Sequence, residues 1–329
     1  MYYDDKTETL RQIFGARTLG LSANHVSIDD RSYPIVDDVI ICLPPESWPG
    51  ELRARLGAFK SPGAPDVAED IQFTFGEEWK VFREVLPEHE DTVQQYFDLL
   101  APNGLTNARV CDLGCGMGRW SYFISRHCRE IVLVDFSEAI FVARHNLRHQ
   151  PNAVFVMADI RALPFAPDFA DVIVCLGVLH HLPTPGLQNV VALRSYAPVL
   201  LVYLYYALDN RPMHFRLMLG LVTPIRRLLA KSRSKVLRAL VSSVVALAVY
   251  RPLIGLGILL RPFGLQSEVP LYDAYHGKSL AGIRQDVYDR FFTPIEQRVT
   301  RRSIEGLRRH FRQVTVSNHL PYWHFLCKR

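Results

Sequence analysis

The chain has few of the features that mark a secreted protein or a structural metal site. Its six cysteines are spread over 329 residues, and no two of them form a C-x-x-C pair. Disulfide-rich domains and zinc sites both depend on closely spaced cysteines, so we expect free thiols, no zinc site and a reducing, cytoplasmic setting. The first residues, MYYDDKTE, are polar and acidic, which argues against a secretory signal.

Acidic residues are missing from one long stretch, Asn210 to Ser267, although the whole chain has a net charge of only +5. Arg and Lys side chains alternate there with aliphatic ones at near-helical spacing. The segment from Ala239 to Leu260 is strongly apolar, but Arg251 and Pro252 interrupt it, which argues against a membrane-spanning helix. The stretch predicts two or three helices that form a lid over the ends of neighbouring strands.

A glycine-rich turn lacks what a phosphate loop requires. An apolar run at 109–113 predicts a buried strand, residues 119–127 predict a helix, and between them lie Gly114, Gly116 and Gly118. A dinucleotide fingerprint would need glycine where Arg119 stands, and no G-x-x-x-x-G-K-[ST] motif is present. Asp112 would repel a pyrophosphate, so the turn favours a ligand without phosphate and with a cationic end, such as S-adenosylmethionine.

This stretch resembles the first motif of the class I S-adenosylmethionine-dependent methyltransferases. The resemblance covers about residues 73–207 and 290–329, and later segments follow in the family's order. It implies an α/β, Rossmann-like fold with a seven-stranded, mostly parallel sheet in the order 3-2-1-4-5-7-6. Helices would cover both faces, with a helical insertion added, and S-adenosyl-L-methionine would be the cofactor.

The resemblance also assigns the residues that would hold the cofactor. Asp135 ends the second predicted strand at the spacing from Gly114 that suits a carboxylate on ribose hydroxyls, although it could instead cap the next helix. Asp159 would accept a hydrogen bond from the adenine amino group, and the backbone N–H of Ile160 would meet the ring. The expected cofactor contacts are Asp112, Gly114, Gly116, Gly118, Asp135, Phe136, Asp159, Ile160, Cys175 and Gly177.

Two adjacent histidines, His180 and His181, match the family's fourth motif within LGVLHHLP. A histidine there can act as a general base near neutral pH, or it can pack and form hydrogen bonds only. We name both as catalytic candidates and favour His181.

Aromatic and polar residues outside these motifs are candidates for contacts with the methyl acceptor. The segment 73–82 is dense in aromatic residues and either covers the cofactor or packs into the core. Tyrosines after the fifth predicted strand and the segment 269–277 would line the acceptor pocket. The candidates are Trp79, Tyr205, Tyr206, Tyr272, Tyr275 and His276.

The sequence divides into five parts. Residues 1–50 form either a degenerate, metal-free module like a zinc ribbon or a plain N-terminal extension. A linker and cap helices (51–104), the first part of the methyltransferase core (105–207), the helical lid (208–289) and the last helix and strands of the core (290–329) follow.

The predicted activity is transfer of a methyl group from S-adenosylmethionine to a small, partly apolar metabolite. The basic insertion could shape an apolar acceptor pocket, rest on anionic lipid through residues 211–265, or bind RNA; the last is least favoured because few aromatic residues are available for stacking. The alternatives are therefore a lipid or RNA methyltransferase and a non-catalytic partner protein that binds S-adenosylmethionine. We expect a cytoplasmic protein that contacts a membrane at most peripherally.

Overall fold

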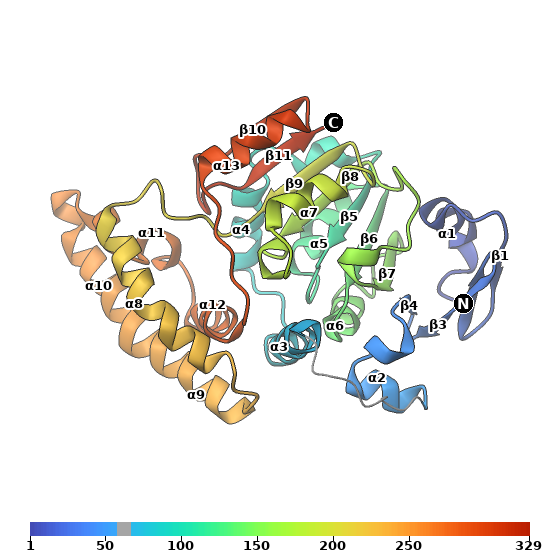
Figure 1. The fold of residues 1–329 in the computed structure, drawn as a ribbon, viewed down its shortest axis with the longest axis horizontal. Coiled ribbons are helices and arrows are strands. Elements are labelled where there is room, and N and C mark those ends of the chain that lie inside the picture. Colours follow the sequence, from blue (N-terminus) through green and yellow to red (C-terminus); the bar gives the residue numbers. More distant parts are fainter. Residues whose placement is uncertain (58–66) are drawn as a thin grey trace.

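The computed structural model describes residues 1–57 and 67–329, and its centre is a mostly parallel sheet (Figure 1). Five adjacent strands run parallel, and the last two strands of the chain add to one edge, where β11 lies antiparallel to both of its neighbours. This is the predicted order 3-2-1-4-5-7-6, which is confirmed. Across the sheet the strands are β7 (Ala153–Met157), β6 (Glu130–Asp135), β5 (Arg109–Leu113), β8 (Val172–Leu176), β9 (Val199–Tyr203), β11 (Phe325–Lys328) and β10 (Gln313–Val316).

Both faces of the sheet are covered by helices because the central strands are apolar on both sides. On β6, Ile131 and Leu133 belong to one buried cluster, and Val132 and Val134 belong to the other. One face packs against α1 (Thr7–Phe14), α7 (Gly186–Leu193) and α13 (Arg301–Glu305). The other face packs against α2 (Gly50–Arg55), α4 (Glu88–Tyr96), α5 (Arg119–Ile124) and α6 (Ala139–Asn146).

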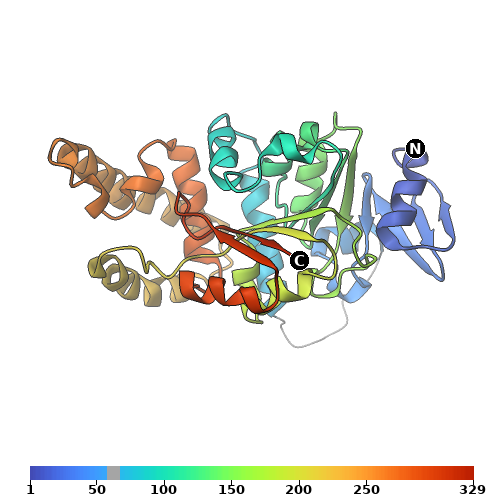
Figure 2. The ribbon, with the colours of Figure 1, turned by 90° about the horizontal axis from the view of Figure 1, so that it is seen from above.

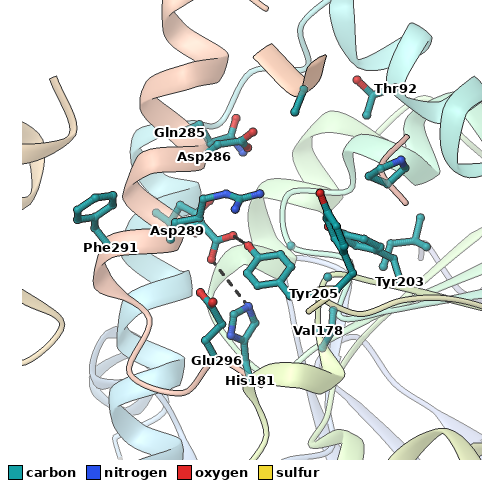
Figure 3. A pocket seen from close by; sticks show the side chains of 18 of the residues that line it. Thr92, Val178, His181, Tyr203, Tyr205, Gln285, Asp286, Asp289, Phe291 and Glu296 are labelled. Carbon is teal, nitrogen blue, oxygen red and sulfur yellow. Dashed lines mark hydrogen bonds and ion pairs between the residues drawn. The ribbon is translucent and has the colours of Figure 1, made fainter. Parts of the chain in front are cut away.

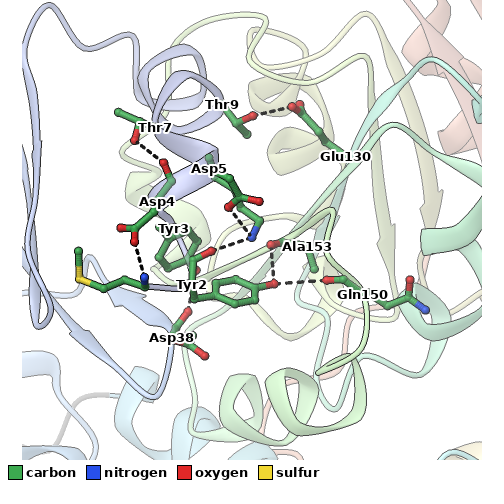
Figure 4. Close-up of polar contacts among 12 residues, drawn as sticks. Tyr2, Tyr3, Asp4, Asp5, Thr7, Thr9, Asp38, Glu130, Gln150 and Ala153 are labelled. Carbon is green, nitrogen blue, oxygen red and sulfur yellow. Dashed lines mark hydrogen bonds and ion pairs between the residues drawn. The ribbon is translucent and has the colours of Figure 1, made fainter.

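The N-terminal residues extend this sheet, so it has eleven strands rather than the predicted seven. Four short strands form an antiparallel meander, and the last of them pairs in parallel with β7. The hydroxyl of Tyr2 donates to the carbonyl of Ala153 over 2.9 Å, and Thr9 donates to Glu130 over 2.6 Å (Figure 4). These contacts are typical of an extension built onto the core edge. The strands are β1 (Leu19–Leu21), β2 (His25–Ile28), β3 (Arg31–Val36) and β4 (Val39–Ile41).

The insertion after β9 stands to one side of the sheet (Figures 1 and 2). It contains α8 (Met213–Leu229), α9 (Lys235–Val245), a π-helical turn (Ala246–Tyr250), α10 (Arg251–Leu260), α11 (Tyr272–Tyr275) and α12 (Leu280–Phe292). Arg251 and Pro252 interrupt the apolar run but not the helix, since one helix runs from Lys235 to Phe263. Proline lacks an N–H and clashes with the carbonyl four residues earlier, and the wider π turn just before Pro252 accommodates both effects.

This continuous helix is long and apolar enough to cross a membrane, judged by length and composition alone, and only 22% of its most apolar window is buried in the protein. One side packs on the remainder of the chain, where Ala246, Tyr250 and Ile254 form a small core with Ile283 and Val287 of α12. The helix therefore has one protein-facing side and one open side.

Other predicted boundaries differ by a few residues. The cap helices expected within 51–104 include α4, and the last helix of the core is α13, followed by a 3₁₀ turn at Gly306–Arg309. The aromatic segment 73–82 falls almost entirely within a helix, α3 (Val67–Val81). The expected linker at 51–70 is described only at its ends, since residues 58–66 lie outside the described part of the chain.

Candidate active site

A large cavity of about 820 Å³ lies between the carboxyl ends of the parallel strands and the helical insertion. Residues that directly follow or end β5, β6, β7 and β8 line one wall, among them Gly114, Asp135, Asp159 and Gly177. Helices α8, α10 and α12 line the opposite wall. Ligands of open α/β sheets bind at these strand ends, and the volume is within the range of pockets that hold small molecules.

The glycine turn closes tightly against its neighbours. Gly114 and Gly116 have φ values of +77° and +53°, which disfavour a side chain. A Cβ atom at Gly116 would lie 2.8 Å from the indole of Trp79, and both residues line the cavity. Gly118 plays a different part, since its Cβ would meet Leu147 on the α6 side and the residue does not line the cavity. It allows close packing of α5 against α6, so the predicted cofactor contact at Gly118 is replaced by a packing contact.

Asp135 lies at the end of β6 with its carboxylate held beside the glycine turn. One oxygen accepts a hydrogen bond from the backbone N–H of Gly116 over 2.9 Å, and the other accepts from Ser137 through its N–H and its hydroxyl. Burial raises the pKa of Asp135, and the hydrogen bonds from Ser137 and Gly116 oppose that rise. Oδ1 already accepts two hydrogen bonds, whereas Oδ2 accepts one and retains a lone pair for a ligand hydroxyl.

Two predicted cofactor residues point into the core instead. Asp112 follows the β alternation onto the face that α5 covers, where it accepts a hydrogen bond from Ser121 over 2.6 Å. Burial raises the pKa of Asp112 to about 6. Cys175 is fully buried on the opposite face of the sheet, near Cys111. Neither residue lines the cavity, so a ligand can contact the glycine turn but not the side chains of Asp112 and Cys175.

The adenine side of the predicted site contains Phe136, Asp159 and Ile160, and all three line the cavity. The Asp159 carboxylate receives both the backbone N–H and the guanidinium of Arg161, with Nη2 at 2.6 Å. A ligand amino group would share Asp159 with this guanidinium. Gly177 has a φ of +82° and open space where a side chain would stand.

Of the two histidines, only His181 reaches the cavity. His180 is fully buried and stacks on Tyr205 at 4.0 Å, and neither ring nitrogen has a hydrogen-bond partner among the described residues. Burial lowers the pKa of His180 well below its ordinary value, so the ring is neutral. The structure therefore places His180 in a packing position.

His181 is oriented by the backbone and lines the cavity, with its second ring nitrogen buried in the cavity wall. Its Nδ1 lies 2.7 Å from the carbonyl of Ile295, which favours the tautomer with the proton on Nδ1. Its Nε2 has no hydrogen-bond partner among the described residues, and the nearest acid is Asp289, whose Oδ1 lies 3.9 Å away (Figure 3). The free lone pair on Nε2 makes His181 able to accept a proton.

Asp289 of α12 was not among the predicted site residues. Its Oδ2 accepts a hydrogen bond from the hydroxyl of Tyr205 over 2.7 Å, and its Oδ1 accepts from Thr293 over 3.1 Å. Tyr205 and Asp289 lie side by side above His181 (Figure 3). The three residues come from distant parts of the chain, so no local motif could have grouped them.

Glu78 is a second acid that the sequence did not predict. It lies one residue before Trp79 on α3, is 1% exposed and lines the cavity. Burial raises the pKa of Glu78 well above its ordinary value, and the nearby Asp289 adds to the effect. Burial therefore favours the neutral form of Glu78, which can donate a hydrogen bond. Its position within the aromatic segment was the signal available in the sequence.

The predicted acceptor residues divide into those at the cavity and one outside it. Trp79, Tyr205, Tyr206, Tyr275 and His276 line the cavity. Tyr272 instead packs against Gly257, where a Cβ would lie 2.1 Å from its ring, and stacks on His276. Its position on α11 directs the ring toward α10 and away from the cavity. The prediction that Tyr272 lines the acceptor pocket is therefore wrong.

Comparison with known proteins identifies the central region. Residues 110–196 match the model of a methyltransferase domain. A ubiquinone biosynthesis O-methyltransferase from Vibrio cholerae is 30% identical over 111 residues, covering 32% of this chain and 45% of that protein. The protein of the same name from Coxiella burnetii is 34% identical over 83 residues, covering 25% of this chain and 36% of that protein. The chain thus spans less than half the length of these curated relatives.

Solved structures of methyltransferases are also similar to parts of the chain. A SAM-dependent methyltransferase from Aquifex aeolicus is 18% identical with a TM-score of 0.33, covering 38% of this chain and 71% of that one. The N-methyltransferase NodS from Bradyrhizobium japonicum, solved with S-adenosyl-L-homocysteine, is 20% identical with a TM-score of 0.32. The match covers 39% of this chain and 72% of that one. Because both TM-scores lie below 0.5, we draw nothing from these two structures.

The strand order, the glycine turn and the matched domain agree with one another. Asp135 and the open turn at Gly177 lie where the family's cofactor residues were predicted, around one cavity. Residues 110–196 are therefore similar to a methyltransferase domain, in agreement with the resemblance seen in the sequence.

Proposed function

We propose that this protein transfers a methyl group from S-adenosylmethionine to the hydroxyl of a small, partly apolar acceptor. The observation that supports this best is the shared cavity, which joins the glycine turn to an oriented histidine with a free Nε2. When bound, S-adenosylmethionine supplies an electrophilic methyl group on its sulfonium. The protein's task is to hold both partners in line, exclude water and accept the acceptor's proton.

The cofactor would lie against the turn at Gly114 and Gly116, with its ribose on Asp135. Arg119 begins α5 next to this turn, lines the cavity and lies over the rings of Trp79 and Trp120. Its guanidinium has no hydrogen bond or ion pair with any residue that the structure describes, so it is available for the cofactor's carboxylate. Asp159 would take the adenine amino group.

His181 would act as the general base. Its Nε2 would take the proton of the acceptor hydroxyl as the oxygen bonds to the methyl carbon, while the carbon–sulfur bonding pair stays on sulfur. Asp289 at 3.9 Å would then stabilise the protonated ring, and the carbonyl of Ile295 would keep it oriented. The proton would leave to solvent when the product departs.

A labelling experiment tests this activity. The full chain is incubated with methyl-labelled S-adenosylmethionine and an extract of apolar metabolites, and labelled products are separated. We expect a labelled product with the wild-type protein and almost none with His181→Ala. Cofactor binding without any labelled product, over a broad set of extracts, would instead favour the non-catalytic partner protein.

The open side of the insertion supports a membrane contact through residues 211–265. Large apolar side chains project there into solvent, including Leu221 at 76%, Val236 at 79% and Phe263 at 74% exposure. Elsewhere among the described residues, only Met1, Val81 and Tyr122 are such exposed apolar side chains. Exposed Arg and Lys lie between the aliphatic residues, and aromatic ones are few, so we favour anionic lipid over RNA.

We therefore propose a cytoplasmic enzyme that rests peripherally on anionic membranes. Sedimentation with vesicles of phosphatidylglycerol and phosphatidylcholine tests this contact. Leu221→Glu combined with Leu228→Glu should abolish binding to the anionic vesicles. Val81→Glu, which changes an exposed apolar residue outside the insertion, should leave binding unchanged. Equal effects of both changes would contradict the assignment.

A further inference from the structure

Arg290 is a cation in the wall of the cavity that makes no direct ion pair with a described residue. It lies on α12, next to Asp289, and its guanidinium has no hydrogen bond or ion pair with any residue that the structure describes. The other cations of this wall are engaged: Lys278 pairs with Asp286 at 2.6 Å, Arg211 pairs with Asp273 at 2.7 Å, and Arg226 and Arg298 pair with Glu296. A guanidinium cannot lose its charge in a protein, so Arg290 has binding capacity left for an anion.

The surroundings of Arg290 are aromatic and hydroxylic. Its guanidinium lies 5.1 Å from the ring of Tyr205 and 6.0 Å from that of Tyr275. Burial raises the pKa of both tyrosines, so their hydroxyls stay protonated. The hydroxyl of Tyr205 already donates to Asp289, so the guanidinium of Arg290 supplies the donors that hold a carboxylate or a phosphate.

Three carboxylates face this part of the cavity, and each has a partner of its own. Burial acts to raise the pKa of Asp286, but Lys278 and Arg290 together keep it below its ordinary value. Asp289 is engaged by hydroxyl donors, and Glu296 by its two arginines. None of the three lies within ion-pair distance of Arg290, which stays available to a ligand.

An apolar arm continues the cavity away from Arg290. Aliphatic and aromatic side chains of α8 line it on one side, and those of the π turn and α10 line it on the other. The same helices expose apolar side chains on their outer surface. Its residues are Phe215, Leu219, Val222, Val249 and Leu253.

We propose that the acceptor is an amphiphile whose carboxylate or phosphate binds Arg290 and whose aliphatic chain occupies the arm between α8 and α10. This inference rests on the proposed function and names its substrate class. Because Arg290 follows Asp289 on α12, the anionic group is held beside the His181–Asp289 pair. The acceptor hydroxyl is thereby oriented toward the base while the chain points away from the cofactor.

Calorimetric titration of the full chain with decanoate, decyl phosphate and decanol tests the inference directly. The ligands are kept below their aggregation limits, and the protein is first saturated with S-adenosylhomocysteine. We expect the two anions to bind and decanol of equal chain length to bind roughly 10- to 150-fold more weakly, the effect of a lost charge-assisted hydrogen bond. The tighter of the two anions identifies the group that Arg290 prefers.

Two variants test separately the binding of the ligand's anionic group and the binding of its aliphatic chain. Arg290→Gln should abolish the preference for the anions, and Arg216→Gln, at an exposed arginine on α8, should retain it. Val222→Asp should weaken decanoate far more than hexanoate, because the shorter chain makes fewer contacts in the arm. Unchanged decanoate affinity in Arg290→Gln, or equal binding of decanol and decanoate, would overturn the inference.

Failure of the inference and failure of the proposed function give different results. If S-adenosylhomocysteine binds but neither anion does, the amphiphile assignment is wrong and the methyl transfer proposal stands. If S-adenosylhomocysteine does not bind, the proposed function fails, and the same amphiphile titrations without it decide the inference alone.

Discussion

The two ends of the cavity are built in different ways. The proposed cofactor end consists mainly of backbone, namely the glycine turn and the strand ends. The Asp135 carboxylate completes it, and its oxygens accept hydrogen bonds from two neighbouring backbone N–H groups. The acceptor end is made of side chains that helices far apart in sequence bring together, among them His181, Tyr205 and Asp289. In the proposed function the first end would bind S-adenosylmethionine, and the second could change its ligand without disturbing the sheet.

The largest expected effect lies at the acceptor end. His181→Ala should slow methyl transfer by about 10²–10⁴-fold, the contribution of a positioned general base, while leaving the cofactor's dissociation constant unchanged. Initial rates with a labelled acceptor, together with calorimetry on the same sample, measure both quantities. Full turnover in the variant would show that His181 only packs, and weakened cofactor binding would show that the two ends are not separate.

At the cofactor end, Asp135→Ala should weaken binding of S-adenosylhomocysteine by about 1.5–3 kcal/mol, the scale of a hydrogen bond to a charged group. Asp135→Asn is the matched control, because an amide keeps the shape and one acceptor oxygen and should lose less. Equal affinities of the alanine variant and the wild type would contradict the ribose assignment and leave Asp135 as a local support of the turn.

Substitution of Asp112 tests whether this side chain, just before the glycine turn, is inaccessible to the ligand. Its pKa rises from 3.8 to about 6 on folding, chiefly through burial, so the folded state binds the proton more tightly than the unfolded state. Its contribution to stability is therefore greatest below pH 4 and is lost as the pH rises through 6. Asp112→Asn, which carries no charge, should raise the free energy of unfolding by up to about 3 kcal/mol at pH 8 relative to the wild type.

Denaturant unfolding of both proteins between pH 4 and pH 8 provides the check. The advantage of the variant should shrink as the pH falls toward 4, and cofactor affinity should change little because Asp112 does not line the cavity. Parallel pH profiles would mean that the carboxyl group does not titrate in this range. A large loss of cofactor binding would place Asp112 back in the site.

The smallest expected effect concerns the outer surface of the insertion. Arg227→Gln removes one exposed positive charge from α8 and should weaken binding to anionic vesicles by about 1 kcal/mol, or roughly fivefold, at low ionic strength. Vesicle sedimentation at two salt concentrations measures the change. An effect that does not diminish with salt would argue for apolar contacts alone.

The same contrast explains what the sequence could predict. The apolar runs at 109–113 and 153–157 coincide with β5 and β7, because a strand buried on both faces has a continuous hydrophobic signature. The spacing from Gly114 to Asp135 is likewise local, and seven of the ten predicted cofactor residues line the cavity, while their contact with a cofactor stays a prediction. The inward turn of Asp112 could have been anticipated from the β alternation, which places it on the face of α5.

The acceptor end depends on packing between distant helices. Nothing near Asp289 or Arg290 in the sequence says that one meets Tyr205 while the other remains unpaired. The continuation of the helix through Pro252 was missed for a similar reason, since a π turn is a local geometric adjustment that composition does not reveal. The pairing of β4 with β7 is also a long-range contact, which periodicity alone cannot predict.

The most direct test of the two-ended cavity is calorimetric titration of S-adenosylhomocysteine into the wild-type protein, Asp135→Ala and Arg290→Gln. We predict micromolar binding at one site in the wild type, a marked loss in Asp135→Ala and unchanged affinity in Arg290→Gln. No binding by the wild type, or equal losses in both variants, would contradict the account.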